Sequence, residues 1–138
     1  MAKQELKLKT ADSEKITINL GPIDLGQIDL LVQEGFYSNR TDLIRTAIRN
    51  QLNQHADVVK QTVARKSLVL GMQHYTRADL EAIRAAGERL HIQVLGLASI
   101  ASDVTVELAL ATIDSIVVLG SLHASAVLKT ALAPRIHH

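Results

Sequence analysis

An alternating segment near the N-terminus constrains the fold of this chain most strongly. Residues 14–20 read EKITINL, so apolar and polar side chains fall on opposite faces: Ile16, Ile18 and Leu20 on one, Lys15, Thr17 and Asn19 on the other. This period of two predicts a half-buried β-strand. No second strand follows before the next helical patterns, so the predicted strand has no partner in its own chain for its backbone hydrogen bonds.

Two helices are expected after the strand. Pro22 suits the first turn of a helix, and apolar residues recur at helical spacing as far as Gly35, a residue type that often terminates helices. Asn39 is then predicted to cap a second helix, with Asp42 three residues later as its partner in a variant of the capping box. We expect this second helix to run to about residue 55.

One strand and two helices, about 45 residues, are too few to hold a monomer together. A second copy solves the problem, because two strands can pair antiparallel while four helices cover their apolar face. We therefore expect an obligate homodimer, with a core formed by Ile16, Ile18, Leu20, Ile28, Leu43, Ile44 and Ile48.

Residues 14–54 resemble the ribbon-helix-helix DNA-binding family, the CopG, MetJ and Arc type of bacterial repressor. The resemblance rests on the KITINL strand, the GFYSNRT turn and the DLIRTAIR run that follows it. It implies that double-stranded DNA is the partner and that the paired strands enter the major groove. Carried onto this sequence, the base-reading residues are Lys15, Thr17 and Asn19, which suit guanine acceptors, a thymine methyl group and adenine, respectively.

The resemblance also implies a phosphate contact at the start of the second helix, through backbone N–H groups that lack partners there. The matching residues are Ser38, Asn39 and Arg40. Arg45 and Arg49 lie one helical turn apart, and we expect them at the surface or in the dimer contact.

The second half of the chain repeats itself. Val-Leu-Gly occurs at residues 69–71, 94–96 and 118–120, so the three glycines are 25 and 24 residues apart. We interpret each triplet as the end of a strand, which gives strands at 68–70, 92–95 and 116–119. A helical pattern follows each of them, at about 77–90, 104–113 and 126–132.

We therefore predict an α+β chain. A flexible arm covers residues 1–13, a ribbon-helix-helix unit residues 14–56, a linker or helix extension residues 57–65, and an α/β domain residues 66–136. This domain would hold about three strand-helix repeats, solenoid-like, in a parallel sheet covered on both faces. A compact strand-helix-strand domain without a true repeat is the alternative. Open edges on such a sheet lead us to expect association into a tetramer or larger assembly.

Several classes of site are not supported by the sequence. The chain has no Cys, and its six His lack carboxylates at ligand spacing, so we expect no metal and no cofactor, unlike the nickel-responsive regulators that share the first unit. His74 and His123, three residues after a repeat glycine, could share one rim, but we interpret both as loop residues of equivalent repeats. There is neither a Gly-rich phosphate loop nor a Gly-x-Ser-x-Gly motif, so we expect no catalytic residue and no enzyme.

We interpret the whole as a sequence-specific repressor that occludes a promoter. With no apolar run of about 18 residues and no secretory signal, we expect a cytoplasmic protein without a membrane partner. One alternative is an antitoxin with a toxin partner, although the C-terminal half reads as folded and not as a disordered tail. The other is a DNA-organising protein that polymerises through its C-terminal domain. The net charge of +1 decides nothing between these functions.

Overall fold

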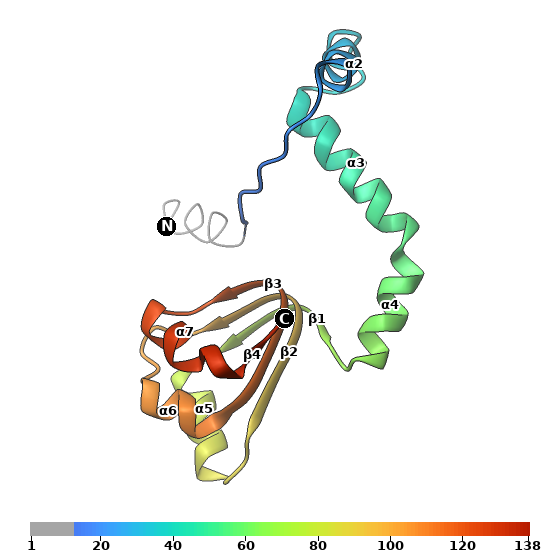
Figure 1. Cartoon of the computed structure of the whole chain (residues 1–138). Helices are drawn as coiled ribbons and strands as arrows, with labels where there is room; N and C mark the ends of the chain where they lie inside the picture. The colour runs from blue at the N-terminus through green and yellow to red at the C-terminus, as the bar shows by residue number, and fades with distance from the viewer. Residues whose placement is uncertain (1–12) are drawn as a thin grey trace. The chain divides into compact units, whose positions relative to one another are not determined.

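The computed structural model describes residues 13–138, which form six helices and one four-stranded sheet (Figure 1). The α+β class is confirmed. The predicted arm at residues 1–13 lies, apart from Ser13, outside the described residues. The chain divides into two compact units, with the boundary between Thr62 and Val63.

The first unit contains α2 (Pro22–Gln33), α3 (Arg40–Gln54) and the start of α4 (Ala56–Arg65). Pro22 lies in the first turn of α2, as its fixed backbone angle favours. Residues 57–65, predicted as a linker or a helix extension, are helical. Residues 13–20 belong to no helix or strand in the single chain. A strand is defined by hydrogen bonds to a neighbouring strand, so the paired ribbon remains a prediction.

The second unit alternates strands and helices: β1 (Val69–Tyr75), α5 (Arg77–Ala85), β2 (Leu90–Ile100), α6 (Val106–Thr112), β3 (Ile113–His123) and α7 (Ala126–Leu132). A short 3-10 helix, η1 (Ala133–Arg135), and a two-residue strand, β4 (Ile136–His137), complete it. All neighbouring strands are parallel, in the order β1-β2-β3-β4. The predicted parallel sheet is thus present, with β4 as an addition that was not predicted.

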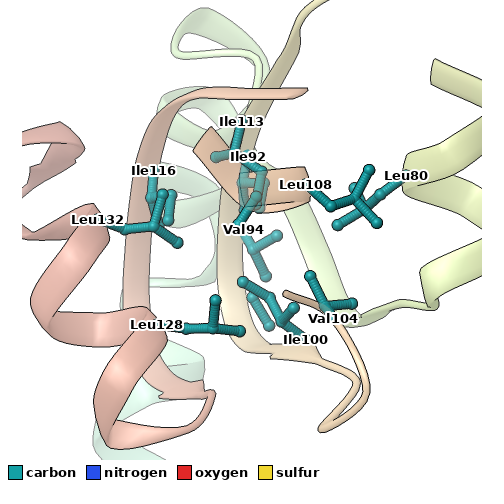
Figure 2. Packing of buried hydrophobic residues seen from close by; sticks show 12 residues of the cluster. Leu80, Ile92, Val94, Ile100, Val104, Leu108, Ile113, Ile116, Leu128 and Leu132 are labelled. Carbon is teal, nitrogen blue, oxygen red and sulfur yellow. The ribbon is translucent and has the colours of Figure 1, made fainter. Parts of the chain in front are cut away.

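One hydrophobic core lies between the sheet and its helices (Figure 2). The sheet contributes alternate residues of β2 and β3, such as Ile92, Val94 and Ile116, and each helix contributes leucines, such as Leu80 and Leu132. The prediction that helices cover both faces of the sheet is wrong, because α5, α6 and α7 all pack on this one face. The reason is topological: when consecutive parallel strands are neighbours and every crossover has the same hand, every helix falls on the same side.

The repeat glycines do not end their strands, contrary to the prediction. Gly71, Gly96 and Gly120 pair with one another in register, and their φ angles are 128°, 138° and 119°. A Cβ on Gly96 would overlap the carbonyl oxygen of Gly71, and a Cβ on Gly120 would overlap that of Gly96. Glycine is therefore required where these backbones approach closely, and the strands continue beyond it. We call Gly71, Gly96 and Gly120 the glycine row.

Two helices are shorter than their patterns predict. Helix α5 ends at Ala85 and not near Leu90, because Gly87 adopts a left-handed conformation and the N–H of Glu88 turns back to the carbonyl of Ile83. Helix α6 begins at Val106, since the Thr105 side chain caps it by accepting a hydrogen bond from the Leu108 N–H at 3.2 Å. Leu90 and Ile113, both predicted to end helices, instead begin β2 and β3.

Candidate nucleic-acid interface

The predicted base-reading residues lie on the segment that precedes α2. Lys15, Thr17 and Asn19 are all exposed. The apolar residues between them are exposed as well, with 75 % of the Ile16 surface and 57 % of the Ile18 surface accessible. In the single chain both faces of this segment therefore contact water, although only the polar face is suited to it.

The helices that follow are equally uncovered. None of α2, α3 or α4 contains a buried residue. Four residues of the predicted dimer core are partly buried: Leu20, Ile28, Leu43 and Ile44. Ile48, also in the predicted dimer core, is exposed. Exposed apolar side chains gathered in this way are typical of an interaction surface.

The turn into α3 is held by a reciprocal pair of side-chain bonds. The Asn39 Oδ1 atom accepts a hydrogen bond from the Asp42 N–H at 2.8 Å, as the predicted cap requires. The Asp42 carboxylate accepts from the Ser38 N–H at 2.9 Å, and thus bonds one residue before the cap. Within the described part of the chain, the N–H groups of Arg40 and Thr41 have no acceptor, so the first turn of α3 can still bind an anion.

The Arg40 side chain is engaged within its own chain. Its Nε and Nη2 atoms donate to the two carboxylate oxygens of Asp29 on α2, both at 2.8 Å. This hydrogen bond also holds the pKa of Asp29 below its ordinary value. The pair fixes the start of α3 against α2, so a phosphate contact in this turn depends on the backbone more than on the Arg40 charge.

Arg45 and Arg49, expected at the surface or in the dimer contact, are exposed and line the same region. A surface hollow of about 360 Å³ is bordered by Ser38, Asn39, Thr41, Asp42, Arg45, Thr46 and Arg49. Across residues 13–138 neither Arg45 nor Arg49 has a carboxylate partner. Their spacing of four residues on one helix is the signal that could have identified them, because it places both charges on one face near the predicted phosphate contact.

His74 and His123 are not loop residues, because they lie near the ends of β1 and β3. His74 pairs in register with Ser99, and Ser99 with His123, so the three lie in one row across β1, β2 and β3. The His74 Nδ1 atom is 2.6 Å from the Ser99 Oγ atom. The described residues contain no group of three His, Cys, Asp or Glu side chains that could hold a metal ion.

A search of the described helices for a membrane-spanning segment finds none of sufficient length and apolarity.

Comparison with known proteins gives one match. The sequence profile of the Ribbon-Helix-Helix transcriptional regulator family matches residues 11–129. Neither the curated proteins nor the solved structures contain a significant match. The matched region includes most of the second unit, so the similarity to this family extends well beyond the N-terminal segment that suggested it.

Proposed function

This chain belongs to the Ribbon-Helix-Helix transcriptional regulator family, a family of DNA-binding regulators, and we propose that it is a repressor that binds its DNA site as a homodimer. The observation that carries the proposal is the absence of any buried residue from α2, α3 and α4 in the single chain. A unit with regular helices, of which α3 is capped by Asn39, and no core of its own needs a second chain.

In the proposed dimer, residues 14–20 of the two chains pair antiparallel. Ile16 and Ile18 then face the helices, while Lys15, Thr17 and Asn19 face away from them, toward the major groove. An antiparallel ribbon fits that groove, whose base edges distinguish all four base pairs. Side chains of these three types can donate to guanine, contact thymine and form a paired hydrogen bond with adenine.

The first turn of α3 is proposed to hold the DNA backbone. The N–H groups of Arg40 and Thr41 would bind a phosphate oxygen, and Ser38 and Asn39 would shape the turn around it. Arg45 and Arg49 would add positive charge along the same side of α3. These contacts would position the protein on DNA without reading the sequence.

Repression would follow from occlusion of a promoter by the bound dimer. The second unit supports this function over the antitoxin alternative, because Val63–His138 fold around a core of their own and are not a disordered tail that wraps a toxin. If this unit joins dimers, neighbouring DNA sites would be occupied together, since tethering raises the effective concentration of the second dimer.

The proposal is tested by selecting bound DNA from a random pool with the full chain and with Lys15→Ala, Thr17→Ala and Asn19→Ala. Each change should relax the preference at particular base positions by about 1–3 kcal/mol per lost contact. The matched control is Arg45→Ala, which should weaken binding to all sequences equally and lower the slope of log affinity against log salt by about one. Unchanged base preferences in all three strand variants would exclude the assigned reading residues.

A further inference from the structure

The parallel sheet of the second unit has two free edges. Strand β1 lies at one end of the order β1-β2-β3-β4, so its outer edge has no neighbour in the described chain. At the other end, β4 pairs with β3 only at Ile116 and Val117. The outer edge of β3 is therefore also unpaired over residues 118–123, within the part of the chain that the structure describes.

Exposed apolar side chains gather at these two edges. Val69 is 44 % exposed, whereas its register partner Val94 on β2 is fully buried. On the face away from the helices, Leu70 and Met72 of β1 are 65 % and 68 % exposed, and Leu119 of β3 is 46 % exposed. Soluble proteins normally protect free edges with charged residues or proline. Neither VLGMQHY of β1 nor VLGSLH of β3 contains either.

The glycine row shows which backbone groups point outward at the two free edges of the sheet. The Cβ positions of Gly96 and Gly120 are each directed at the carbonyl oxygen of the glycine on the preceding strand. Gly71 has the same kind of backbone conformation, with φ of 128°, yet nothing lies within 4 Å of its Cβ position. By the same geometry, the Cβ side of Gly71 faces outward across the edge of β1, and the carbonyl of Gly120 faces outward from β3.

We propose that β1 of one chain pairs in parallel with the free stretch of β3 in a second copy of the chain. Gly71 would lie in register with Gly120 of that copy, so the glycine row would continue from one molecule to the next. Val69 and Leu70 would lie beside Val118 and Leu119 of the neighbour. The free stretch begins directly after the two residues that β4 occupies, so the pairing and β4 use different parts of β3.

The backbone of β1 is oriented for this pairing. The Gly71 carbonyl faces β2, and the Tyr75 carbonyl accepts a hydrogen bond from the Ala101 N–H at 2.9 Å. Because alternate residues of a strand bond to opposite sides, the N–H groups of Leu70, Met72 and His74 face the free edge. In the proposed register, the Gly120 carbonyl of the neighbour accepts from the Met72 N–H.

Such a contact joins two different surfaces, so it generates a closed ring where the rotation between copies closes and an open chain where it does not. It would therefore link successive ribbon dimers into a larger assembly, in which each dimer still presents its reading strands. The inference rests on the proposed function only where it assumes that the first units pair as a dimer. The edge contact itself is argued from residues of the second unit alone.

The test compares Met72→Pro, which removes the outward N–H, with Met72→Ala, which keeps it and removes only the side chain. Sedimentation velocity of the full chain over a range of concentrations should show the wild type and Met72→Ala above the dimer mass and growing with concentration. Met72→Pro should remain at the dimer mass, with its association weakened at least about tenfold by the lost ladder bond. A wild type that stays a dimer throughout, or a Met72→Pro variant that assembles like Met72→Ala, would overturn the proposal.

A charge exchange tests the orientation without introducing proline. Leu70→Glu and Leu119→Lys should each weaken assembly, and the double variant should recover it by up to about fivefold, because the two positions become neighbours only between chains. Within one chain β2 separates them. Absence of recovery would exclude this register and favour a two-fold pairing of β1 with β1. Binding to a single DNA site is measured in parallel, since its absence in the wild type would count against the proposed function and not against the edge pairing.

Discussion

The two units of this molecule are built from similar helices but differ in what covers their apolar faces. In the second unit, Leu80, Leu108 and Leu132 are buried against a sheet that belongs to the same chain. In the first unit, α2 and α3 are just as regular, and neither contains a buried residue. The contrast shows that a helix can be defined by local signals, such as Pro22 at the start of α2 and the Asn39 cap of α3, whereas a core depends on whether its partner is within reach along the chain.

The two units differ in whether a partner strand follows nearby in the same chain. In the second unit each strand is followed by a helix and then by its neighbouring strand, about one repeat later. In the first unit the strand-forming segment has no such successor before the chain enters α4. We therefore expect the first unit to need a second chain in order to fold, whereas the second unit folds as a single chain and gains from higher concentration only what the proposed edge pairing adds.

The largest effect is expected within the second unit, from glycine substitutions that separate close approach from backbone strain. Gly96→Ala places a Cβ on the Gly71 carbonyl and adds positive-φ strain, so it should lower the free energy of unfolding by about 2–6 kcal/mol. At concentrations too low for the proposed edge pairing, Gly71→Ala meets only the strain and should cost about 1–3 kcal/mol. Urea denaturation that follows the unfolding of the second unit measures the free energy of unfolding of both variants. Equal losses in Gly96→Ala and Gly71→Ala would show that the overlap with the Gly71 carbonyl is relieved.

The next largest effect is expected from truncating one apolar residue in the core of each unit. Leu80→Ala should lower the unfolding free energy of the second unit by about 2–5 kcal/mol at any protein concentration. Ile48→Ala, in the proposed dimer core, should instead lower a transition of the first unit whose midpoint rises with concentration. Thermal unfolding at two concentrations tenfold apart distinguishes these outcomes. A first-unit midpoint that does not move with concentration contradicts the obligate dimer.

The smallest effect is expected on stability at low pH, where one exposed carboxylate in each unit becomes protonated. The bond from Arg40 lowers the pKa of Asp29, and the bond from the Thr76 N–H lowers that of Asp79, both below 3.8. A lowered folded-state pKa contributes stability that is present above the unfolded value and lost as pH falls through the folded one. Stability measured from pH 5 down to pH 2 should therefore decline less steeply in the first unit of Asp29→Asn and in the second unit of Asp79→Asn. A variant that changes the decline in the other unit would contradict the assignment.

Local signals in the sequence predicted much of this structure. Pro22 marks the start of α2 through its fixed backbone angle, and Asn39 marks the start of α3 through a bond to a residue three positions on; the structure contains both. The three-fold repetition of strand and helix predicted the parallel sheet. These features depend on neighbours along the chain, so a single sequence contains the information that fixes them.

Features that depend on distant backbone were predicted less well. The glycines of the repeat were interpreted as strand ends because their carbonyl neighbours, 24 or 25 residues away, are invisible to a local pattern. In the candidate interface, the bond between Arg40 and Asp29 joins residues 11 positions apart on two helices. The base-reading and phosphate-binding assignments remain predictions, since they concern partners beyond the single chain.

The glycine row has a consequence for how the second unit can change in length during evolution. One residue inserted into β2 between Leu90 and Gly96 would move the glycine out of its row and exchange the side chains that meet the helices for those that face away. Single insertions and deletions next to the glycine row are thus expected to be disruptive, whereas the register already shifts by one residue at the start of β2, between Leu90 and His91. Growth of this unit is expected to proceed by duplication of whole repeats, each of which brings its own glycine into line.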